Sequence, residues 1–245
     1  MRAHTFVRGE YTITATDSGT AGQRTFLLVH GIGMGIPYFS ALAGELEQHG
    51  RVVAVDLPGF GNSPEPRHAL TMAQTGALLI DFVEAEGLGR PILIGHSMGT
   101  QVVAEAAAQR PDLFPELVLV APTLNRLERS MGREAWRMLQ DLFGESPKVI
   151  GVGLKNYART GPRWFIKKLN AMMAHTVEDT LPLIQAHTLV VRGGRDRVCP
   201  GGWVAEVAAL IPNAVMVEIA GCGHETMVKD PAPVAREIMR HVNRV

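Results

Sequence analysis

The chain has 245 residues, of which 46% are apolar and 20% are charged, and its formal net charge is zero. This length and composition favour one globular domain of ordinary size, with room for an insertion. The balance of 24 basic and 24 acidic residues gives no reason to expect nucleic acid or an anionic membrane as a partner.

The first residues contain no apolar core of signal-peptide length, and no segment approaches the ~20 apolar residues that span a bilayer. The two cysteines, Cys199 and Cys222, have neither disulfide-framework nor zinc-motif spacing, so we interpret them as buried, reduced thiols. We therefore expect a cytoplasmic protein with no membrane partner. The sequence leaves a homo-oligomer open.

Apolar runs and helical patterns alternate along most of the chain. Residues 11–16 alternate in polarity, which predicts an antiparallel edge hairpin with the residues before them. The expected strands are 26–30, 51–56, 92–94, 117–120, 187–191 and 214–219, and the expected helices are 44–49, 72–86, 101–109, 202–210 and 233–241. Because these strands are apolar on both faces, the sequence predicts an α/β fold with a mostly parallel, doubly wound sheet of about eight strands.

The alternation stops between about residue 124 and residue 182, where helical pieces rich in Met, Trp, Arg and Lys replace the strands. We therefore expect a core domain over 1–123 and 183–245, and a helical insertion over 124–182.

A serine lies at the centre of the sequence Gly95-His96-Ser97-Met98-Gly99, between an expected strand and an expected helix. A serine in such a turn is held in a strained backbone conformation with its hydroxyl at the carboxyl end of the sheet. Glycines two residues away on each side avoid side-chain clashes in so tight a turn. The pattern predicts a nucleophilic serine at position 97.

A serine hydroxyl needs a nearby base, and the base needs a group that orients it. Loops at the carboxyl ends of the strands are the place to expect them. Asp196 follows the strand at 187–191 and His224 follows the strand at 214–219. Asp56 fits a structural turn better, and Glu225 cannot easily reach the ring of its own neighbour.

The order Ser97, Asp196, His224, together with the serine turn, closely resembles the α/β-hydrolase superfamily. His30-Gly31-Ile32-Gly33-Met34 matches the oxyanion loop of that family, Asp56 to Ser63 matches its D-x-P-G-x-G-x-S turn, and the insertion lies where the family carries a helical cap. The resemblance implies Ser97 as nucleophile, His224 as general base and acid, and Asp196 as orienting carboxylate.

The resemblance also implies an oxyanion hole formed by the backbone N–H groups of Ile32 and Met98, with Gly33 as the fallback donor. His30 is expected to brace the oxyanion loop, and His96 to pack beside the site rather than act as a base. No histidine pair has metal-binding spacing and no glycine-rich stretch matches a nucleotide loop, so we expect neither a metal nor a cofactor.

The cap would form the roof of the pocket. Its 10 basic and 6 acidic residues are mostly expected on a solvated face, with one or two arginines as candidates for binding a substrate carboxylate. Met131, Trp136 and Met172 are the candidate substrate-binding residues.

The expected function is that of a serine hydrolase that cleaves a small, largely apolar carbonyl substrate (an ester, thioester or lactone) through an acyl-enzyme. A C–C bond hydrolase acting on a carboxylate-bearing diketone, acyl transfer, and a non-catalytic ligand-binding member of the fold are the alternatives.

Overall fold

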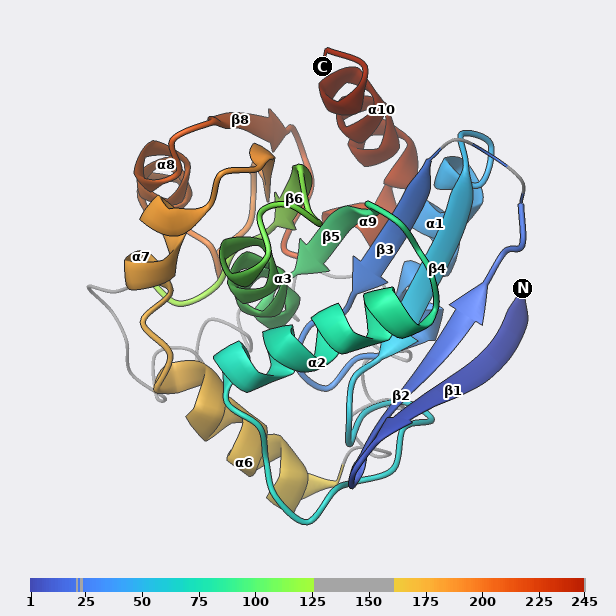
Figure 1. The fold of residues 1–245 in the computed structure, drawn as a ribbon. Coiled ribbons are helices and arrows are strands. Elements are labelled where there is room, and N and C mark those ends of the chain that lie inside the picture. Colours follow the sequence, from blue (N-terminus) through green and yellow to red (C-terminus); the bar gives the residue numbers. More distant parts are fainter. Residues whose placement is uncertain (21, 23, 126–160, 245) are drawn as a thin grey trace.

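A computed structural model describes residues 1–20, 22, 24–125 and 161–244, which form one eight-stranded sheet with helices on both faces (Figure 1). The strand order is β1-β2-β4-β3-β5-β6-β7-β8. β1 and β2 form an antiparallel hairpin, β2 pairs antiparallel with β4, and all later pairs are parallel. The strands are β1 (Arg2–Arg8), β2 (Tyr11–Asp17), β3 (Thr25–Val29), β4 (Arg51–Asp56), β5 (Ile92–His96), β6 (Glu116–Val120), β7 (His187–Gly193) and β8 (Ala214–Ile219).

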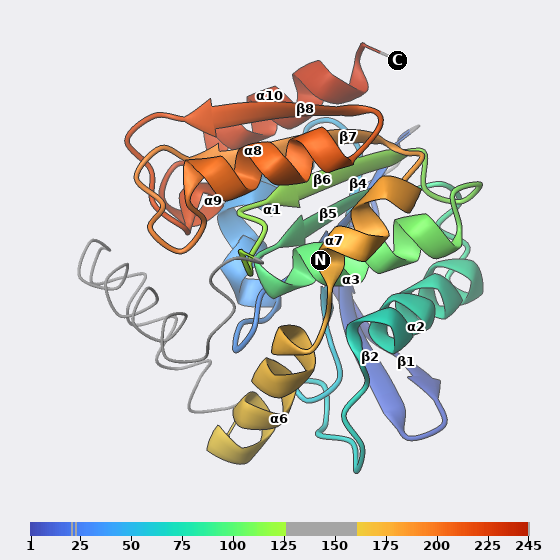
Figure 2. The ribbon, with the colours of Figure 1, turned by 90° about the vertical axis from the view of Figure 1, so that its left-hand side faces the viewer.

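Helices pack on both faces of the sheet. The α-helices are α1 (Ser40–Leu46), α2 (Met72–Ala85), α3 (Met98–Gln109), α6 (Pro162–Met173), α7 (Val177–Thr180), α8 (Gly201–Leu210), α9 (Thr226–Lys229) and α10 (Pro231–Val242), with 3-10 turns η1 (Ile36–Phe39) and η3 (Leu181–Leu183). α2, α3 and α8 cover one face, and α1 and α10 cover the other (Figure 2).

The central strands form the core because their residues are apolar on both sides. β5 is buried along its whole length, and β3 and β6 are buried except at their first residues. The outer strands β1 and β8 consist mainly of exposed and partly buried positions, as expected at sheet edges. The sequence-based prediction of an eight-stranded, mostly parallel α/β sheet with an N-terminal hairpin is therefore confirmed.

Element boundaries differ from the prediction mainly at helix starts. α3 begins at Met98 rather than at residue 101, because the turn at Ser97 leads directly into the helix. α1 spans residues 40–46 rather than 44–49, because it continues directly from η1 and ends before the turn at residues 47–49.

Three helical segments precede β7: α6 and α7 lie within the predicted insertion, and η3 ends one residue beyond its predicted boundary. Figure 2 shows α6 below α3 and apart from the sheet. Residues 126–160 lie outside the described residues, so the division into a core over 1–123 and 183–245 and a cap over 124–182 stays a prediction.

The return from α6 to the sheet is attached to α3 by one carboxylate. Glu105 on α3 accepts hydrogen bonds from His175 Nε2 at 2.8 Å and from the Thr180 hydroxyl at 2.6 Å. These two hydrogen bonds, with a smaller contribution from Gln109, lower the pKa of Glu105 although burial opposes the shift. The carboxylate therefore stabilises the attachment of the insertion to the core.

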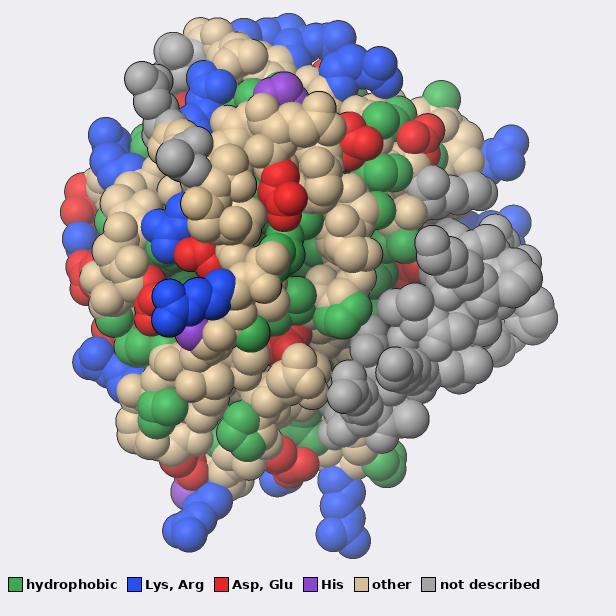
Figure 3. All heavy atoms as spheres, turned by 90° about the vertical axis from the view of Figure 1, so that its right-hand side faces the viewer, with side chains coloured by type: hydrophobic (Ala, Val, Ile, Leu, Met, Phe, Trp, Pro, Cys, Tyr) green, Lys and Arg blue, Asp and Glu red, His purple; other side chains and the backbone are tan. Residues whose placement is uncertain are grey.

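Among the described helices, none is long and apolar enough to cross a bilayer. On the face drawn in Figure 3, basic and acidic side chains are interspersed among the described residues. This mixed surface agrees with the zero formal charge of the sequence.

We predict that Glu105→Gln lowers the free energy of unfolding at pH 7 by about 1 kcal/mol, because a half-buried, charge-assisted interaction is weakened. In a chain of this size the melting temperature should fall by about 2–4 °C. Since the pKa of Glu105 is lowered on folding, its contribution is present above its ordinary pKa and is lost as the pH falls through the folded value.

Thermal unfolding at pH 7 and below pH 4 measures both effects. Asp112→Asn is the control, since it removes an exposed carboxylate that pairs with Arg110 and should change the melting temperature little. An equal destabilisation by Glu105→Gln at both pH values would contradict a role for the ionised carboxylate.

Candidate active site

The turn between β5 and α3 holds Ser97 in a conformation that few non-glycine residues adopt, with φ +53° and ψ −120°. The N–H of Ser97 donates to Val120 O at 3.0 Å, and its carbonyl accepts from both the N–H and the hydroxyl of Thr100. Ser97 is 7% exposed and lies where the strand ends and the helix begins. This is the strand, turn and helix that the sequence predicts around the candidate nucleophile.

Two glycines make this turn geometrically feasible. A Cβ on Gly95 would lie 2.6 Å from Gly99 O, and a Cβ on Gly99 would lie 2.2 Å from Val29 O of β3. Neither backbone atom can move aside without disturbing the sheet. The glycines flanking Ser97 are therefore required by close packing, as the sequence analysis expects.

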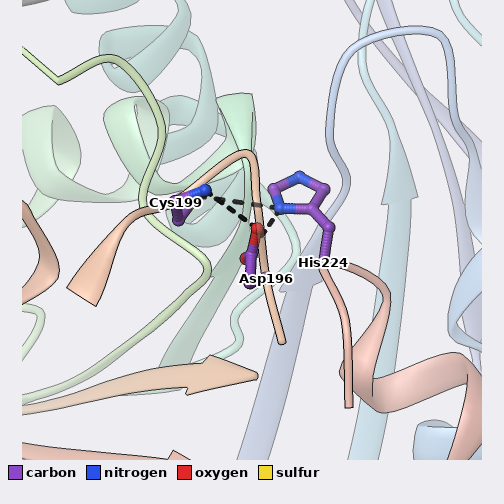
Figure 4. Close-up of side chains that lie close together, drawn as sticks. All are labelled: Asp196, Cys199 and His224. Carbon is purple, nitrogen blue, oxygen red and sulfur yellow. Dashed lines mark hydrogen bonds and ion pairs between the residues drawn. The ribbon is translucent and has the colours of Figure 1, made fainter. Parts of the chain in front are cut away.

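The loops after β7 and β8 bring Asp196 and His224 together. His224 Nδ1 lies 3.0 Å from Asp196 Oδ2, and the other carboxylate oxygen accepts the backbone N–H groups of Val198 and Cys199, both at 2.8 Å (Figure 4). Because the carboxylate accepts at Nδ1, that nitrogen carries the proton and Nε2 is left with its lone pair. His224 is thus held in the tautomer that a general base requires.

The environment of Asp196 favours its charged form. Burial alone would raise the pKa of Asp196, but the charge and hydrogen bond of His224 and the two backbone N–H donors together outweigh burial and lower it. A carboxylate kept ionised behind an imidazole stabilises the imidazolium that forms when the ring takes a proton.

Arg192, which the sequence analysis did not single out, braces the acid loop. The residue is 9% exposed, and its side chain donates to Cys199 O at 2.8 Å and to Asp196 O at 3.0 Å. It also pairs with Glu218 of β8. The guanidinium therefore ties both ends of the 196–199 turn to the neighbouring strand.

Cys199 is closer to the site than its sequence suggests. Both cysteines are buried and free, as expected, but Cys199 Sγ lies 3.7 Å from His224 Nδ1. Asp196, Cys199 and His224 each offer one ligand atom, all within 4.8 Å of one another, so this is where a metal ion could be held. The same atoms already form the hydrogen bonds of the acid–imidazole pair, and we assign them to that pair.

His96 links the serine turn to the imidazole. Its Nε2 donates to the backbone carbonyl of His224 at 3.1 Å, and the two ring centroids are 4.9 Å apart. Burial, followed by the neighbouring His224, lowers the pKa of His96 to about 3. His96 is therefore a neutral packing residue that adjoins Ser97 in the chain and His224 in space.

The loop after β3 packs directly against Ser97. A Cβ on Gly31 would lie 2.9 Å from Ser97 Cβ, and the loop closes by a hydrogen bond from Met34 N to Gly31 O. Ile32 is 5% exposed and Gly33 has φ +72°. Met98, the first residue of α3, has an N–H without an intrahelical acceptor. The candidate oxyanion donors Ile32, Gly33 and Met98 thus lie on the two segments that adjoin the serine.

His30 and Asp56 hold this loop from behind. His30 Nδ1 donates to Gly31 O at 2.7 Å, and its Nε2 accepts the N–H of Leu57. Asp56 accepts the backbone N–H groups of Ile36 and Asn62. Both side chains have the bracing roles expected from the sequence, and Asp56 is not available to His224.

The candidate substrate-binding residues are only partly described. Met131 and Trp136 lie outside the described residues. Met172, on α6, is 3% exposed, and its carbonyl accepts from Gln101 Nε2 at 3.4 Å. Gln101 is one turn after Ser97 on α3, so α6 reaches the helix that carries the candidate nucleophile.

Solved structures of several hydrolases have this fold. An esterase from Thermogutta terrifontis is 23% identical and superposes with a TM-score of 0.84, covering 100% of this chain and 99% of the esterase. An enol-lactonase from Burkholderia xenovorans is 17% identical, with a TM-score of 0.84 and coverage of 98% and 100%. At these identities the likeness establishes the fold alone.

Sequence comparison establishes the family. A protein from Klebsiella pneumoniae named "Putative carbamate hydrolase RutD" is 26% identical over 254 aligned positions, which cover 89% of this chain and 96% of that protein. The family model described as "Alpha/beta hydrolase family" matches residues 26–237. The chain is a member of the alpha/beta hydrolase family.

Proposed function

We propose that the protein is a serine hydrolase that cleaves a small, largely apolar carbonyl substrate through an acyl-enzyme intermediate. The observation that carries the proposal is the pairing of His224 Nδ1 with the buried Asp196 carboxylate, beside the turn that holds Ser97 at the carboxyl edge of the sheet. The esters, thioesters and lactones expected from the sequence remain the candidate substrates.

In this mechanism Ser97 Oγ attacks the substrate carbonyl and its proton passes to His224 Nε2. Asp196 stabilises the resulting imidazolium through Nδ1, which already carries a proton. The carbonyl oxygen becomes an oxyanion that accepts hydrogen bonds from the backbone N–H groups of Met98 and of Ile32 or Gly33. Collapse of the intermediate expels the leaving group with the proton from His224, and water activated by the same ring then hydrolyses the acyl-enzyme.

The name of the Klebsiella relative adds carbamates to the candidate substrate classes. A carbamate also contains a carbonyl that a serine can attack, and its cleavage uses the same oxyanion and imidazole. Carbamates therefore belong in the substrate panel beside esters and lactones.

The nucleophile is tested by covalent labelling. A fluorophosphonate probe is expected to modify the protein once, on the peptide that contains Ser97, as mapped by mass spectrometry. Ser97→Ala should abolish both labelling and ester turnover, with a loss in kcat of ~10³-fold or more.

Ser40→Ala, at the exposed start of α1, is the matched control and should label like the native protein. Full labelling of Ser97→Ala would refute the assignment. Labelling of Ser97 without turnover of any ester, lactone or carbamate would favour a ligand-binding role or C–C bond hydrolysis.

The orienting role of Asp196 is tested by Asp196→Asn. The amide keeps the shape of the carboxylate but cannot stabilise an imidazolium, and it favours the wrong tautomer of His224. We expect kcat to fall by ~10³- to 10⁴-fold, with a smaller change in KM. Asp112→Asn, on the surface, is the control and should leave kcat unchanged. A similar, modest loss of kcat in both variants would argue against a catalytic role for the Asp196–His224 pair.

The oxyanion loop is tested by Gly31→Ala. The added Cβ would lie 2.9 Å from Ser97 Cβ and 3.3 Å from His96 Nδ1, so the loop must move away from the serine. We expect a loss in kcat of ~10- to 100-fold, because oxyanion donors act only at the right distance. Gly44→Ala on α1 meets no atom within 4 Å and is the control. Steady-state kinetics of both variants would test this expectation. Full activity of Gly31→Ala would exclude a role for this loop in stabilising the oxyanion.

A further inference from the structure

One face of α6 places a lysine side chain in the protein interior. Trp164, Lys168 and Met172, spaced four residues apart, are the buried residues of this helix. Lys168 is only 3% exposed, whereas its neighbour Lys167 is half exposed and lies near the surface carboxylate of Glu65. Two adjacent lysines on one helix therefore have opposite environments.

The contacts on either side of Lys168 locate it relative to the candidate active site. One turn before it, the ring of Trp164 packs against Gly59, where an added Cβ would lie 2.0 Å from Nε1. One turn after it, Met172 O is bonded to Gln101, which lies one turn beyond Ser97. Lys168 thus lies between the turn that follows β4 and the helix that begins at the serine.

Lys168 also acts electrostatically on the base of the oxyanion loop. Burial is the main cause that lowers the pKa of His30, the charge of Asp56 and the hydrogen bond to Gly31 oppose it, and the positive charge of Lys168 makes the smallest contribution, which lowers the pKa. His30 donates to Gly31, whose backbone packs on Ser97. The ammonium group is therefore within electrostatic range of the loop proposed to hold the oxyanion.

The described residues satisfy the ammonium group incompletely. Among them, its one hydrogen-bond acceptor is the backbone carbonyl of Leu70 at 3.1 Å, and no carboxylate pairs with it. Burial lowers the pKa of Lys168 to about 8, so that most of these amines remain charged at pH 7. A buried charge with one neutral acceptor is costly unless a counter-charge arrives.

A second polar group on the same face of α6, Trp164 Nε1, also lacks a hydrogen-bond partner among the described residues. Structural polar groups in protein interiors are nearly always hydrogen-bonded. Unused donors on both inward-facing polar residues of one helix favour a ligand that supplies acceptor oxygens.

We propose that Lys168 is a substrate-binding residue that recognises a carboxylate on the acyl or leaving group, while the scissile carbonyl lies at Ser97. The inference rests on the proposed function and narrows its substrate to carbonyl compounds that carry one negative charge. A single buried cation balances a carboxylate, whereas a doubly charged phosphate would leave one charge buried without a partner. The apolar side chains of α6 then contact the remainder of the substrate.

The test compares two aryl esters of equal size, the phenyl ester of succinic acid, which carries a free carboxylate, and the phenyl ester of succinamic acid, which carries a neutral amide. We expect the native protein to prefer the carboxylate by at least ~10-fold in kcat/KM. Lys168→Met should reduce this ratio to about one, mainly through KM, and Lys168→Arg should retain part of it. Lys167→Met is the control and should keep the native ratio.

A second measurement does not depend on turnover. N-phenylsuccinamate, which has the carboxylate, should raise the melting temperature of the native protein and of Lys167→Met, but not that of Lys168→Met. The neutral diamide analogue should raise none of them. This measurement also applies to Lys168→Arg if Lys168→Met does not fold.

Two results would overturn the proposal: an ester ratio near one in the native protein, or a ratio unchanged in Lys168→Met together with equal stabilisation by both ligands. Fluorophosphonate labelling separates this failure from failure of the proposed function. Labelled Ser97 without preference for the carboxylate refutes the role of Lys168 alone. Stabilisation by the carboxylate without any labelling refutes the serine mechanism but retains the anion site.

Discussion

The strained turn at Ser97 is the constraint on which the rest of the site depends. A non-glycine residue at φ +53° costs on the order of 1–3 kcal/mol, so the surrounding structure must hold it. The hydrogen bond from Ser97 N to Val120 O ties the turn to β6, and the contact of Gly99 with Val29 O ties it to β3. The two strands that flank β5 therefore hold the serine, which explains why the site lies at the centre of the sheet.

The acid and the imidazole reach this turn because their loops are attached to each other. Arg195 N donates to Cys222 O, and a Cβ on Gly193 would lie 2.1 Å from Gly223 O, so the segments after β7 and β8 are in backbone contact. Arg192 adds a side-chain brace to the same loop. The register of two parallel strands, rather than the two side chains themselves, thus sets the separation of Asp196 and His224.

The parts of the structure that sequence could predict are those encoded by local patterns. Continuous apolar runs predicted the central strands, and Ser97, Asp196 and His224 were each predicted from a short loop after such a run. The contacts of Cys199 and Arg192 with the acid loop could not be predicted, because they depend on how the 196–199 turn folds back on β7. Lys168 was counted only as one of ten basic residues in the insertion. Its spacing of four residues from Trp164 and from Met172 is the sequence signal that could have predicted its burial on the inward face of the helix.

The buried polar groups around the serine and α6 differ in how fully the described residues satisfy them. Asp56 and Asp196 use both carboxylate oxygens, and His30 uses both ring nitrogens, so these groups fix the backbone around the serine. In contrast, Trp164 Nε1 has no hydrogen-bond partner among the described residues, and Lys168 has one acceptor there for its three donors. Both donors lie on the inward face of α6, where we propose that the substrate carboxylate binds. A buried donor without an acceptor costs free energy, and an anionic substrate bound beside α6 would recover it.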